Sequence, residues 1–173
     1  EEPCFIGASV HRKPAVARGY LPPDANCRLA VGAPWCSSRN YRNVVVSDKV
    51  PQRQLLTMDE ARTHCAKGVG IWEMYSHAPE QPDIVLACAG DIPTQETVAA
   101  AWLLRQYAPE LKVRVVNIVD LMRLCPSDRH PHGMSDAEFT DIFTTNTPVL
   151  FTFHVYPGVI HDLLHGRDAH DQF

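Results

Sequence analysis

The sequence predicts an α/β fold, with a mostly parallel sheet flanked by helices. Three apolar runs, 84–88, 113–119 and 149–153, have the length of buried strands and alternate with helical patterns. The first run, within DIVLACAG, is apolar on both faces, which is typical of a strand that helices cover on each side. Strands that alternate with helices imply right-handed βαβ crossovers.

The N-terminal part predicts the tail of a second, separate α/β unit. AVARGYL (15–21) and NVVVS (43–47) predict two short strands, and the β-branched valines favour the second. Residues 26–37 predict a short helix that Pro34 disturbs or ends. The polar, proline-containing segment DKVPQRQLL (48–56) predicts a linker, so we expect a domain boundary there.

Two capping boxes predict where later helices begin. Thr57 is followed three residues on by Glu60, and Ser135 by Glu138. In this motif each side chain satisfies a free backbone amide of the other residue. The first of these helices should end at the glycines of KGVG.

A long helix is expected after DIVLACAG. Thr94 is its predicted N-cap, and Pro109 should break the pattern at its far end. Spacing of i, i+4 predicts a buried stripe made of Val98, Ala99, Trp102, Leu103 and Tyr107. Residues 120–124 predict the start of a short helix, and 157–166 a final helix with a glycine stop.

Composition excludes several classes of partner. The 173 residues are 45% hydrophobic and 21% charged, with a net charge of −4 and no basic stripe, so nucleic-acid binding is not expected. No apolar run approaches the roughly 20 residues of a membrane helix. The N-terminus has no secretory pattern, and the six cysteines form no CxxC pair, so we expect reduced thiols and a cytoplasmic protein. Because the first residue is Glu1, we expect a processed chain, a piece of a longer protein or an incomplete reading frame.

Candidate functional residues follow the predicted strands. Gly90, Asp120 and His154 lie at carboxyl ends, where ligands of α/β sheets collect. The turn CAGDIPT has no GxGxxG or GxxxxGK[ST] pattern, so we predict a packing turn rather than a phosphate loop. His130 and His132 in HPH lack a third metal ligand, and a solvated loop is expected there.

Lys49 is a candidate anion contact, because it follows the strand predicted at 43–47. Together with Arg39 and Asn40 it could receive a phosphate, and a solvated surface lysine is the alternative. For His154 the alternative is a core histidine with satisfied hydrogen bonds. No GxSxG, HExxH or nucleophile–base set is present, so the residues alone predict no complete active site.

A family resemblance adds to this interpretation. From about residue 11 to the end, the chain resembles xylulose-5-phosphate/fructose-6-phosphate phosphoketolase. The stretches that carry the likeness are YLPPDANC, SRNYRNVVV, DEARTHCAKGVGIWEMYS, DIVLACAGDIPTQET, LKVRVVNIVDLMRL, HPHGMSDAEFTDIFTTNTPVLFTFH and YPGVIHDLL. The resemblance implies a thiamine-diphosphate enzyme that uses inorganic phosphate to cleave a ketose phosphate into acetyl phosphate and an aldose phosphate.

The resemblance also implies which part of such an enzyme the chain represents. Residues 1–50 would end the pyrimidine-binding middle domain, 51–56 would be the linker, and 57–173 would be an incomplete C-terminal domain resembling that of transketolase. The family's GDG motif and the glutamate that activates thiamine are absent from this sequence. Thiamine diphosphate and Mg²⁺ are therefore expected in the complete homo-oligomeric enzyme, and neither cofactor nor activity in this chain alone.

Two residues carry over as predicted substrate-binding positions. Lys49, in SDKVP where the family usually has AGKQP, matches a lysine near the substrate phosphate. His154, in HVYPG where the family often has HGYPW, is expected to shape the domain interface. The departures at Asp48, Val155 and Gly158 fit an alternative, a stand-alone non-catalytic binding or subunit-interaction domain. A further alternative, an isolated flavodoxin-like domain, is disfavoured because the phosphate loop is absent.

Overall fold

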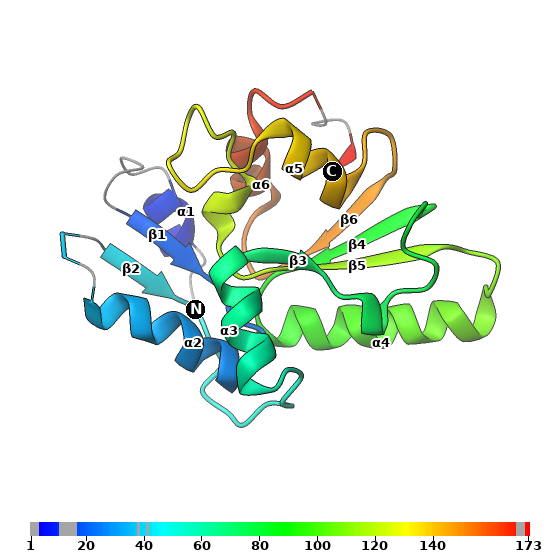
Figure 1. Ribbon diagram of the computed structural model, residues 1–173, viewed down its shortest axis with the longest axis horizontal. Coiled ribbons are helices and arrows are strands. Elements are labelled where there is room, and N and C mark those ends of the chain that lie inside the picture. Colours follow the sequence, from blue (N-terminus) through cyan, green and yellow to red (C-terminus); the bar gives the residue numbers. More distant parts are fainter. Residues whose placement is uncertain (1–3, 11–16, 38, 41, 169–171) are drawn as a thin grey trace.

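The computed structural model describes residues 4–10, 17–37, 39–40, 42–168 and 172–173 (Figure 1). Its main sheet has the strand order β3-β5-β4-β6. These strands are β3 (Val69–Ile71), β4 (Ile84–Cys88), β5 (Val113–Ile118) and β6 (Val149–Thr152). β4 pairs in parallel with both β5 and β6, whereas β3 pairs with β5 in antiparallel fashion. The prediction of a mostly parallel α/β sheet is therefore confirmed.

Helices cover both faces of this sheet. The 17-residue helix α4 (Asp91–Tyr107) and helix α3 (Met58–Lys67) lie on one side. The 3-10 helix η2 (Leu121–Leu124) and the helices α5 (Asp136–Phe143) and α6 (Pro157–Leu164) lie on the other (Figure 1). A second 3-10 turn, η1 (Glu73–Tyr75), follows β3.

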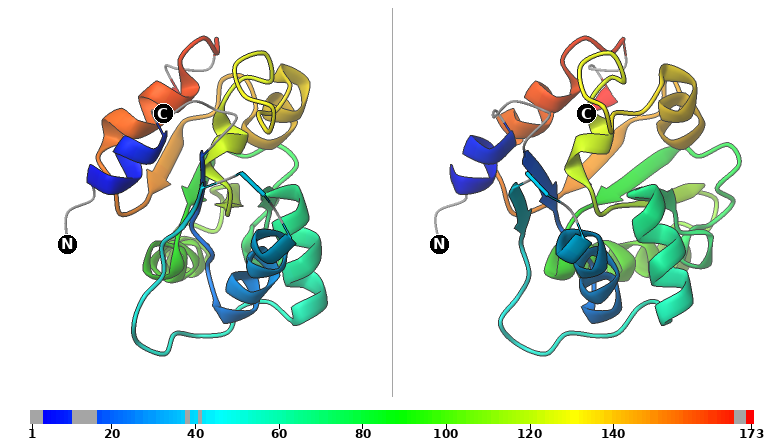
Figure 2. Two further views of the ribbon diagram at one scale, coloured as in Figure 1. Left: turned by 90° about the vertical axis from the view of Figure 1, so that its left-hand side faces the viewer. Right: turned by 60° about the vertical axis from the view of Figure 1, so that its left-hand side comes forward.

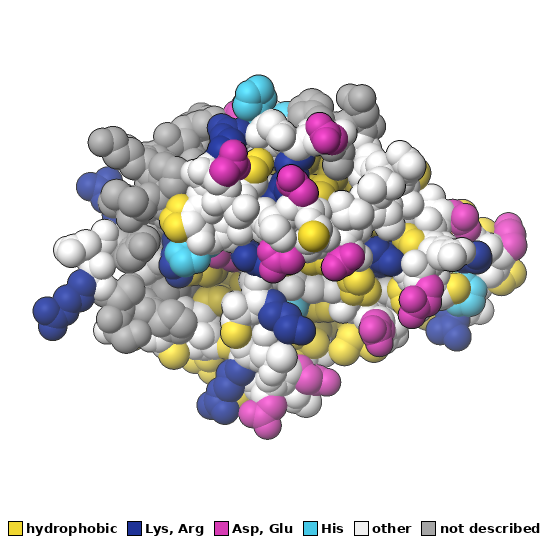
Figure 3. All heavy atoms as spheres, turned by 45° about the horizontal axis from the view of Figure 1, so that its top comes forward, with side chains coloured by type: hydrophobic (Ala, Val, Ile, Leu, Met, Phe, Trp, Pro, Cys, Tyr) yellow, Lys and Arg dark blue, Asp and Glu magenta, His cyan; other side chains and the backbone are white. Residues whose placement is uncertain are grey.

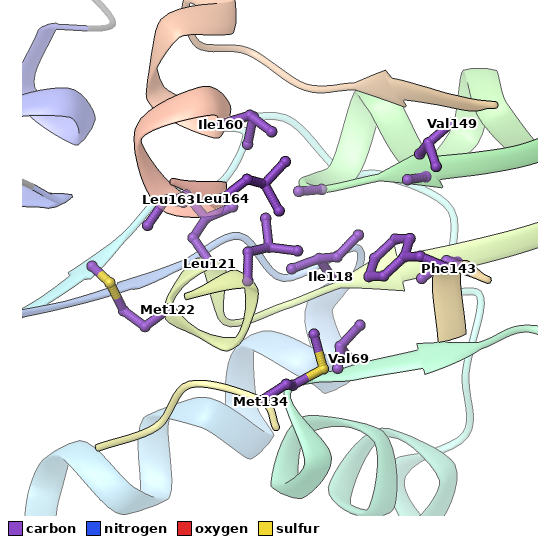
Figure 4. Packing of buried hydrophobic residues seen from close by; sticks show 14 of the residues in the cluster. Val69, Ile118, Leu121, Met122, Met134, Phe143, Val149, Ile160, Leu163 and Leu164 are labelled. Atoms are coloured by element: carbon purple, nitrogen blue, oxygen red, sulfur yellow. The ribbon is translucent and has the colours of Figure 1, made fainter. Parts of the chain in front are cut away.

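The core shows why β4 is apolar throughout. Val85 and Ala87 pack into the cluster formed with α5 and α6, whereas Leu86 packs into the cluster on the α4 side. Successive side chains of a strand point to opposite faces, so a strand that helices cover on both faces buries side chains on both. Figure 4 shows Ile118 of β5 and Val149 of β6 converging with Leu121, Phe143 and Leu164 on the α5–α6 side.

The N-terminal part forms a small sheet of its own that packs against the main sheet. It contains α1 (Cys4–Val10), β1 (Ala17–Tyr20), α2 (Ala25–Ser37) and β2 (Arg42–Val45). β1 and β2 lie at the two predicted strands and pair in parallel. Residues 15 and 16 of the first predicted strand lie outside the described residues. Figure 2 shows α1 beside α6, where Gly7 approaches Val159.

Asp24 fastens the N-terminal part to the rest of the chain. It directly precedes α2, and its Oδ1 accepts the Cys27 amide at 2.8 Å, as an N-cap does. Its Oδ2 accepts the amides of Leu55 and Leu56 at 3.0 and 2.8 Å. The same carboxylate therefore caps α2 and holds the end of the segment that leads into α3.

Residues 46–57 contain neither helix nor strand, as predicted for the segment 48–56. Both capping boxes are present, Thr57 with Glu60 and Ser135 with Glu138. α3 ends at Gly68, whose φ of +75° belongs to the left-handed region. No helix among the described residues is long and apolar enough to span a membrane.

Two expectations for α4 are wrong. α4 begins at Asp91, so Thr94 lies inside it and donates its hydroxyl to the Gly90 carbonyl at 2.5 Å. The predicted stripe is largely exposed, with Trp102 at 61% and Tyr107 at 84%, and the face that packs on the sheet consists instead of Asp91, Pro93, Thr94, Thr97 and Ala101. Small side chains let the helix backbone approach the sheet closely, and this outweighs the pattern of large apolar residues.

α2 continues past Pro34 to Ser37, so this proline does not end the helix. A proline removes only its own i→i−4 hydrogen bond, and the three residues after Pro34 stay helical. β3 was not predicted, because three residues that include Gly70 give too short a pattern.

Arg167 holds the C-terminal segment against the loop before α5. Its guanidinium is buried and donates to the carbonyls of Leu124, Cys125 and Met134 at 2.9, 2.6 and 2.8 Å. It also pairs with Asp136 Oδ1 at 2.8 Å. Only the planar fork of arginine can reach so many acceptors at once.

We expect Arg167→Lys to lower the free energy of unfolding by about 2 kcal/mol, because buried carbonyls lose their donor. Urea unfolding measures the change. Arg62→Lys is the matched control, because the Arg62 side chain is 69% exposed and pairs only with an exposed carboxylate in the described structure. The control should change stability by less than about 0.5 kcal/mol. Equal effects of the two changes would contradict this role of Arg167.

Candidate functional site

The turn between β4 and α4 lies at the carboxyl edge of the sheet, and its own residues fill it. Gly90 has a φ of +97° and donates its amide to the Leu21 carbonyl at 3.1 Å. Asp91 Oδ1 accepts the Ile92 amide at 2.9 Å, and its Oδ2 accepts the Asp48 amide at 2.5 Å. A carboxylate of the chain thus occupies the positive end of α4, where a phosphate loop would hold its anion. The turn is a packing element that joins three segments.

A buried chain of hydrogen bonds supports the turn from beneath. His64 Nε2 lies 2.8 Å from Asn117 Oδ1, and Asn117 Nδ2 donates to Thr94 Oγ1 at 2.9 Å. Burial is the largest cause that lowers the pKa of His64, so its imidazole is neutral at pH 7 and donates from Nε2. The hydrogen bonds of His64, Asn117 and Thr94 therefore connect α3, β5 and α4, and no sequence motif predicts these hydrogen bonds.

Lys49 lies at this edge and is exposed. Its neighbour Asp48 accepts the Val50 amide at 3.1 Å and a hydrogen bond from Gln52 Nε2. The Val50 amide is the largest cause that lowers the pKa of Asp48, and the positive charge of Lys49 contributes. The Asp48 carboxylate is therefore charged beside the Lys49 ammonium at neutral pH.

His154 approaches the same edge from β6. The Thr152 carbonyl, two residues earlier, accepts the Ala89 amide at 3.1 Å. The turn at residues 89–91 thus contacts Asp48, the residue before Lys49, and Thr152, two residues before His154. His154 is exposed, so the alternative of a core histidine is wrong.

Arg39 and Asn40 do not join Lys49. Both precede β2, whereas Lys49 follows it, so the length of the strand separates them. The expectation that these three side chains share one phosphate is therefore wrong. Parallel strands present their carboxyl ends at one edge, and Arg39 and Asn40 belong to the other edge.

Asp120 lies at the end of β5 and faces a separate cavity of about 490 Å³. Its carboxyl is 6% exposed, and Oδ1 accepts the Met122 amide at 2.9 Å. Burial raises the pKa of Asp120 to about 6, against the opposing effects of the Met122 amide, Arg18 and Arg123. Tyr20 of β1 forms a β-bridge with Asp120, so the N-terminal part supplies one wall.

The HPH segment packs into the structure and is not the solvated loop that the sequence suggests. His130 is 3% exposed, and its Nδ1 accepts the His132 amide at 3.0 Å. The His132 ring accepts a hydrogen bond at Nε2 from Arg18, which lies 114 residues away in the sequence. Burial is the largest cause that lowers the pKa of His132, and the charges of Arg18 and Arg123 add to it. Within the described ranges, no three His, Cys, Asp or Glu side chains gather as a metal site.

Asp120 should make stability depend on pH. Its pKa is raised from 3.8 to about 6, so the folded chain holds the Asp120 proton more tightly than the unfolded chain. The free energy of unfolding should therefore fall as pH rises from 3.8 to about 6, and it should stay level at higher pH. The total loss should be about 3 kcal/mol, because each pKa unit corresponds to about 1.4 kcal/mol. In Asp120→Asn this loss should disappear.

Urea unfolding of both chains from pH 4 to pH 7.5 measures the difference, with the exposed Asp59→Asn as control. A difference between wild type and Asp120→Asn that does not vary with pH would contradict the assignment. So would a wild-type advantage that grows as pH rises.

Comparison with known proteins gives the family. The family model described as XFP C-terminal domain matches residues 49–173. Proteins described as probable phosphoketolase are similar along nearly the whole chain: one from Rhodopseudomonas palustris (strain BisB5) is 52% identical over 170 residues, 98% of this chain and 22% of its own length. Another from Nocardia farcinica is 50% identical over 174 residues, 99% of this chain and 21% of its own length.

Solved structures give the fold. A transketolase from Leishmania mexicana aligns with 95% of this chain and 22% of its own, with a TM-score of 0.68 and 16% identity. A transketolase from Pichia stipitis aligns with 81% of this chain and 18% of its own, with a TM-score of 0.57 and 17% identity. Identities this low show the shared fold alone, which is the transketolase-like arrangement that the sequence predicts.

The chain spans about a fifth of the length of the curated relatives that it matches. The likeness to phosphoketolase that the sequence suggests is confirmed by the family match and by identities near 50%. The chain belongs to the XFP C-terminal domain family.

Proposed function

We propose that the chain is the C-terminal portion of a phosphoketolase, an aldehyde-lyase of carbohydrate metabolism. The complete enzyme would convert xylulose 5-phosphate or fructose 6-phosphate, with inorganic phosphate, to acetyl phosphate and an aldose phosphate. The observation that carries this proposal is the 52% identity over 98% of the chain to a protein described as a probable phosphoketolase. The complete enzyme would act in the cytoplasm as a homo-oligomer.

The complete enzyme would use thiamine diphosphate and Mg²⁺, and this chain alone would hold neither. The Asp91 carboxylate fills the N-terminal end of α4, where it accepts the amides of Ile92 and of Asp48, the residue before Lys49. The described residues contain no cluster of three side chains suited to a metal. We propose that the cofactor chemistry belongs to the rest of the enzyme and that this chain shapes the rim of the site.

A domain division is part of the same proposal. We propose that residues 1–50 end the middle domain, 51–56 are the linker and 57–173 form the C-terminal domain. Lys49 would then stand at the end of one domain while His154 belongs to the next. Between them lies the turn at Gly90 and Asp91, which contacts both parts.

Lys49 would bind the substrate phosphate through its mobile ammonium, and His154 would shape the interface beside it. The neighbouring Asp48 carboxylate reduces the net positive charge that Lys49 offers. We therefore expect a weaker phosphate contact here than in relatives with glycine at position 48.

The alternative function is a non-catalytic domain that binds another subunit. The exposed aromatic face of α4, with Trp102 and Tyr107, favours it. In that case the complete polypeptide would form assemblies without producing acetyl phosphate.

In the longer protein that contains this chain, Lys49→Ala should raise the KM for the ketose phosphate about tenfold with little change in kcat, because one charge-assisted contact is lost. Acetyl phosphate, trapped as its hydroxamate, provides the assay. Lys112→Ala removes another exposed lysine and serves as control. An unchanged KM would remove the assignment of Lys49, and absence of acetyl phosphate from the wild-type protein would overturn the proposed activity.

A further inference from the structure

The cavity at Asp120 has no role in the proposed chemistry, although it is well built. Its walls come from β1 and α2 on one side and from α3, η2 and the HPH loop on the other. None of Lys49, Asp91 and His154 lines it. We propose that this cavity binds a small phosphomonoester as a second anion site, separate from the proposed substrate site.

Positive charge dominates the lining. Arg18, Arg62, Lys67 and Arg123 supply four cations, and Asp120 is the one acidic residue among the described residues that line the cavity. Arg62 and Arg123 also pair with Asp59 and Glu138, each at 3.3 Å. Those carboxylates are 94% and 54% exposed, and ion pairs so accessible to water contribute little and exchange readily with a ligand.

Two guanidinium groups are held in place around the His132 backbone and ring. Arg18 donates to the Tyr20 hydroxyl at 3.0 Å and to the His132 ring. Arg123 donates through Nη1 to the His132 carbonyl at 3.2 Å. Its Nε is buried and has no hydrogen-bond partner among the described residues. Fixed arginine forks match the geometry of phosphate oxygens, and their ordering lowers the entropic cost of binding.

Gly68 shows how closely the cavity floor is packed. A Cβ at this position would lie 2.9 Å from Arg123 Cγ and 3.1 Å from Asp120 Cβ. The Gly68 carbonyl accepts the amides of Val119 and Asp120 at 2.8 and 2.9 Å. The absent side chain therefore lets Arg123 and Asp120 lie directly on the backbone that ends α3.

The size and the remaining lining define the ligand class. The volume of about 490 Å³ is within the range of small-molecule sites. One wall is apolar and consists of Ala30, Val31 and Ala33 of α2. This combination suits a phosphate group carried on a compact organic body. It does not suit a polymer, because on the face shown in Figure 3 basic and acidic side chains are interspersed rather than gathered in a stripe.

Calorimetric titration of the full chain with inorganic phosphate and with glycerol 3-phosphate, at constant ionic strength, tests the proposal. Glycerol 3-phosphate should bind with a Kd of about 1 mM or lower, and at least as tightly as phosphate. Lys67→Gln at the rim should weaken binding about threefold to tenfold, and Arg18→Gln more than tenfold. Lys112→Gln and Lys49→Gln should leave the Kd unchanged.

Alkylation of cysteines gives a second readout that does not need a variant. Cys65 lines the cavity and is half-buried, whereas Cys36 is exposed and outside it. Glycerol 3-phosphate should slow iodoacetamide labelling of Cys65, followed by mass spectrometry, without slowing that of Cys36.

Three results would overturn the proposal: no binding of glycerol 3-phosphate, binding of inorganic phosphate alone, or binding lost in Lys49→Gln and kept in Arg18→Gln. The last result would place the anion at the proposed substrate site. Conversely, loss of binding in Arg18→Gln alone would support the second site even if the longer protein proved to make no acetyl phosphate.

Discussion

The Asp24 carboxylate is the constraint on which the arrangement of the two parts depends. It is 2% exposed, and it accepts three backbone amides, one from α2 and two from the segment before α3. Burying a carboxylate costs free energy unless hydrogen-bond donors satisfy it. Asp24 therefore holds the three amides close to itself and to one another. Around this anchor the chain buries Cys27 and Leu56 in the same cluster as Trp72 and Ala101.

The functional edge follows from this anchor. With α2 in place, β1 ends where Leu21 accepts the Gly90 amide and donates its own amide to Val119 at 2.8 Å. The strand-to-helix turn and the end of β5 are therefore both fixed by one short segment after β1. Lys49 lies near the strand-to-helix turn, because its neighbour Asp48 bonds to Asp91, and Arg18 lies near Asp120 at the end of β5. The two proposed anion sites thus lie at the same junction.

Sequence patterns predicted the elements that are determined by interactions between residues close in the sequence. The apolar runs of β4, β5 and β6 and the capping boxes at Thr57 and Ser135 need only neighbouring residues to form. The buried face of α4 could not be predicted in this way, because close approach to the sheet selects Thr97 and Ala101 over Trp102. The contact of Arg18 with His132 joins residues 114 positions apart, and no periodicity encodes it. Lys49 and His154 became candidates because they follow predicted strands, and the resemblance added the roles expected for them.

Native-state hydrogen exchange of Asp24→Ala would test the central claim most directly, with Asp83→Ala as control, because Asp83 accepts the amide of Lys112 far from the junction. The account predicts that Asp24→Ala loses protection throughout α2 and at Leu55 and Leu56, while β4 and β5 stay protected. In the control, α2 should exchange as in the wild type. Unchanged protection of α2 in Asp24→Ala would contradict the claim that this carboxylate holds the two parts together.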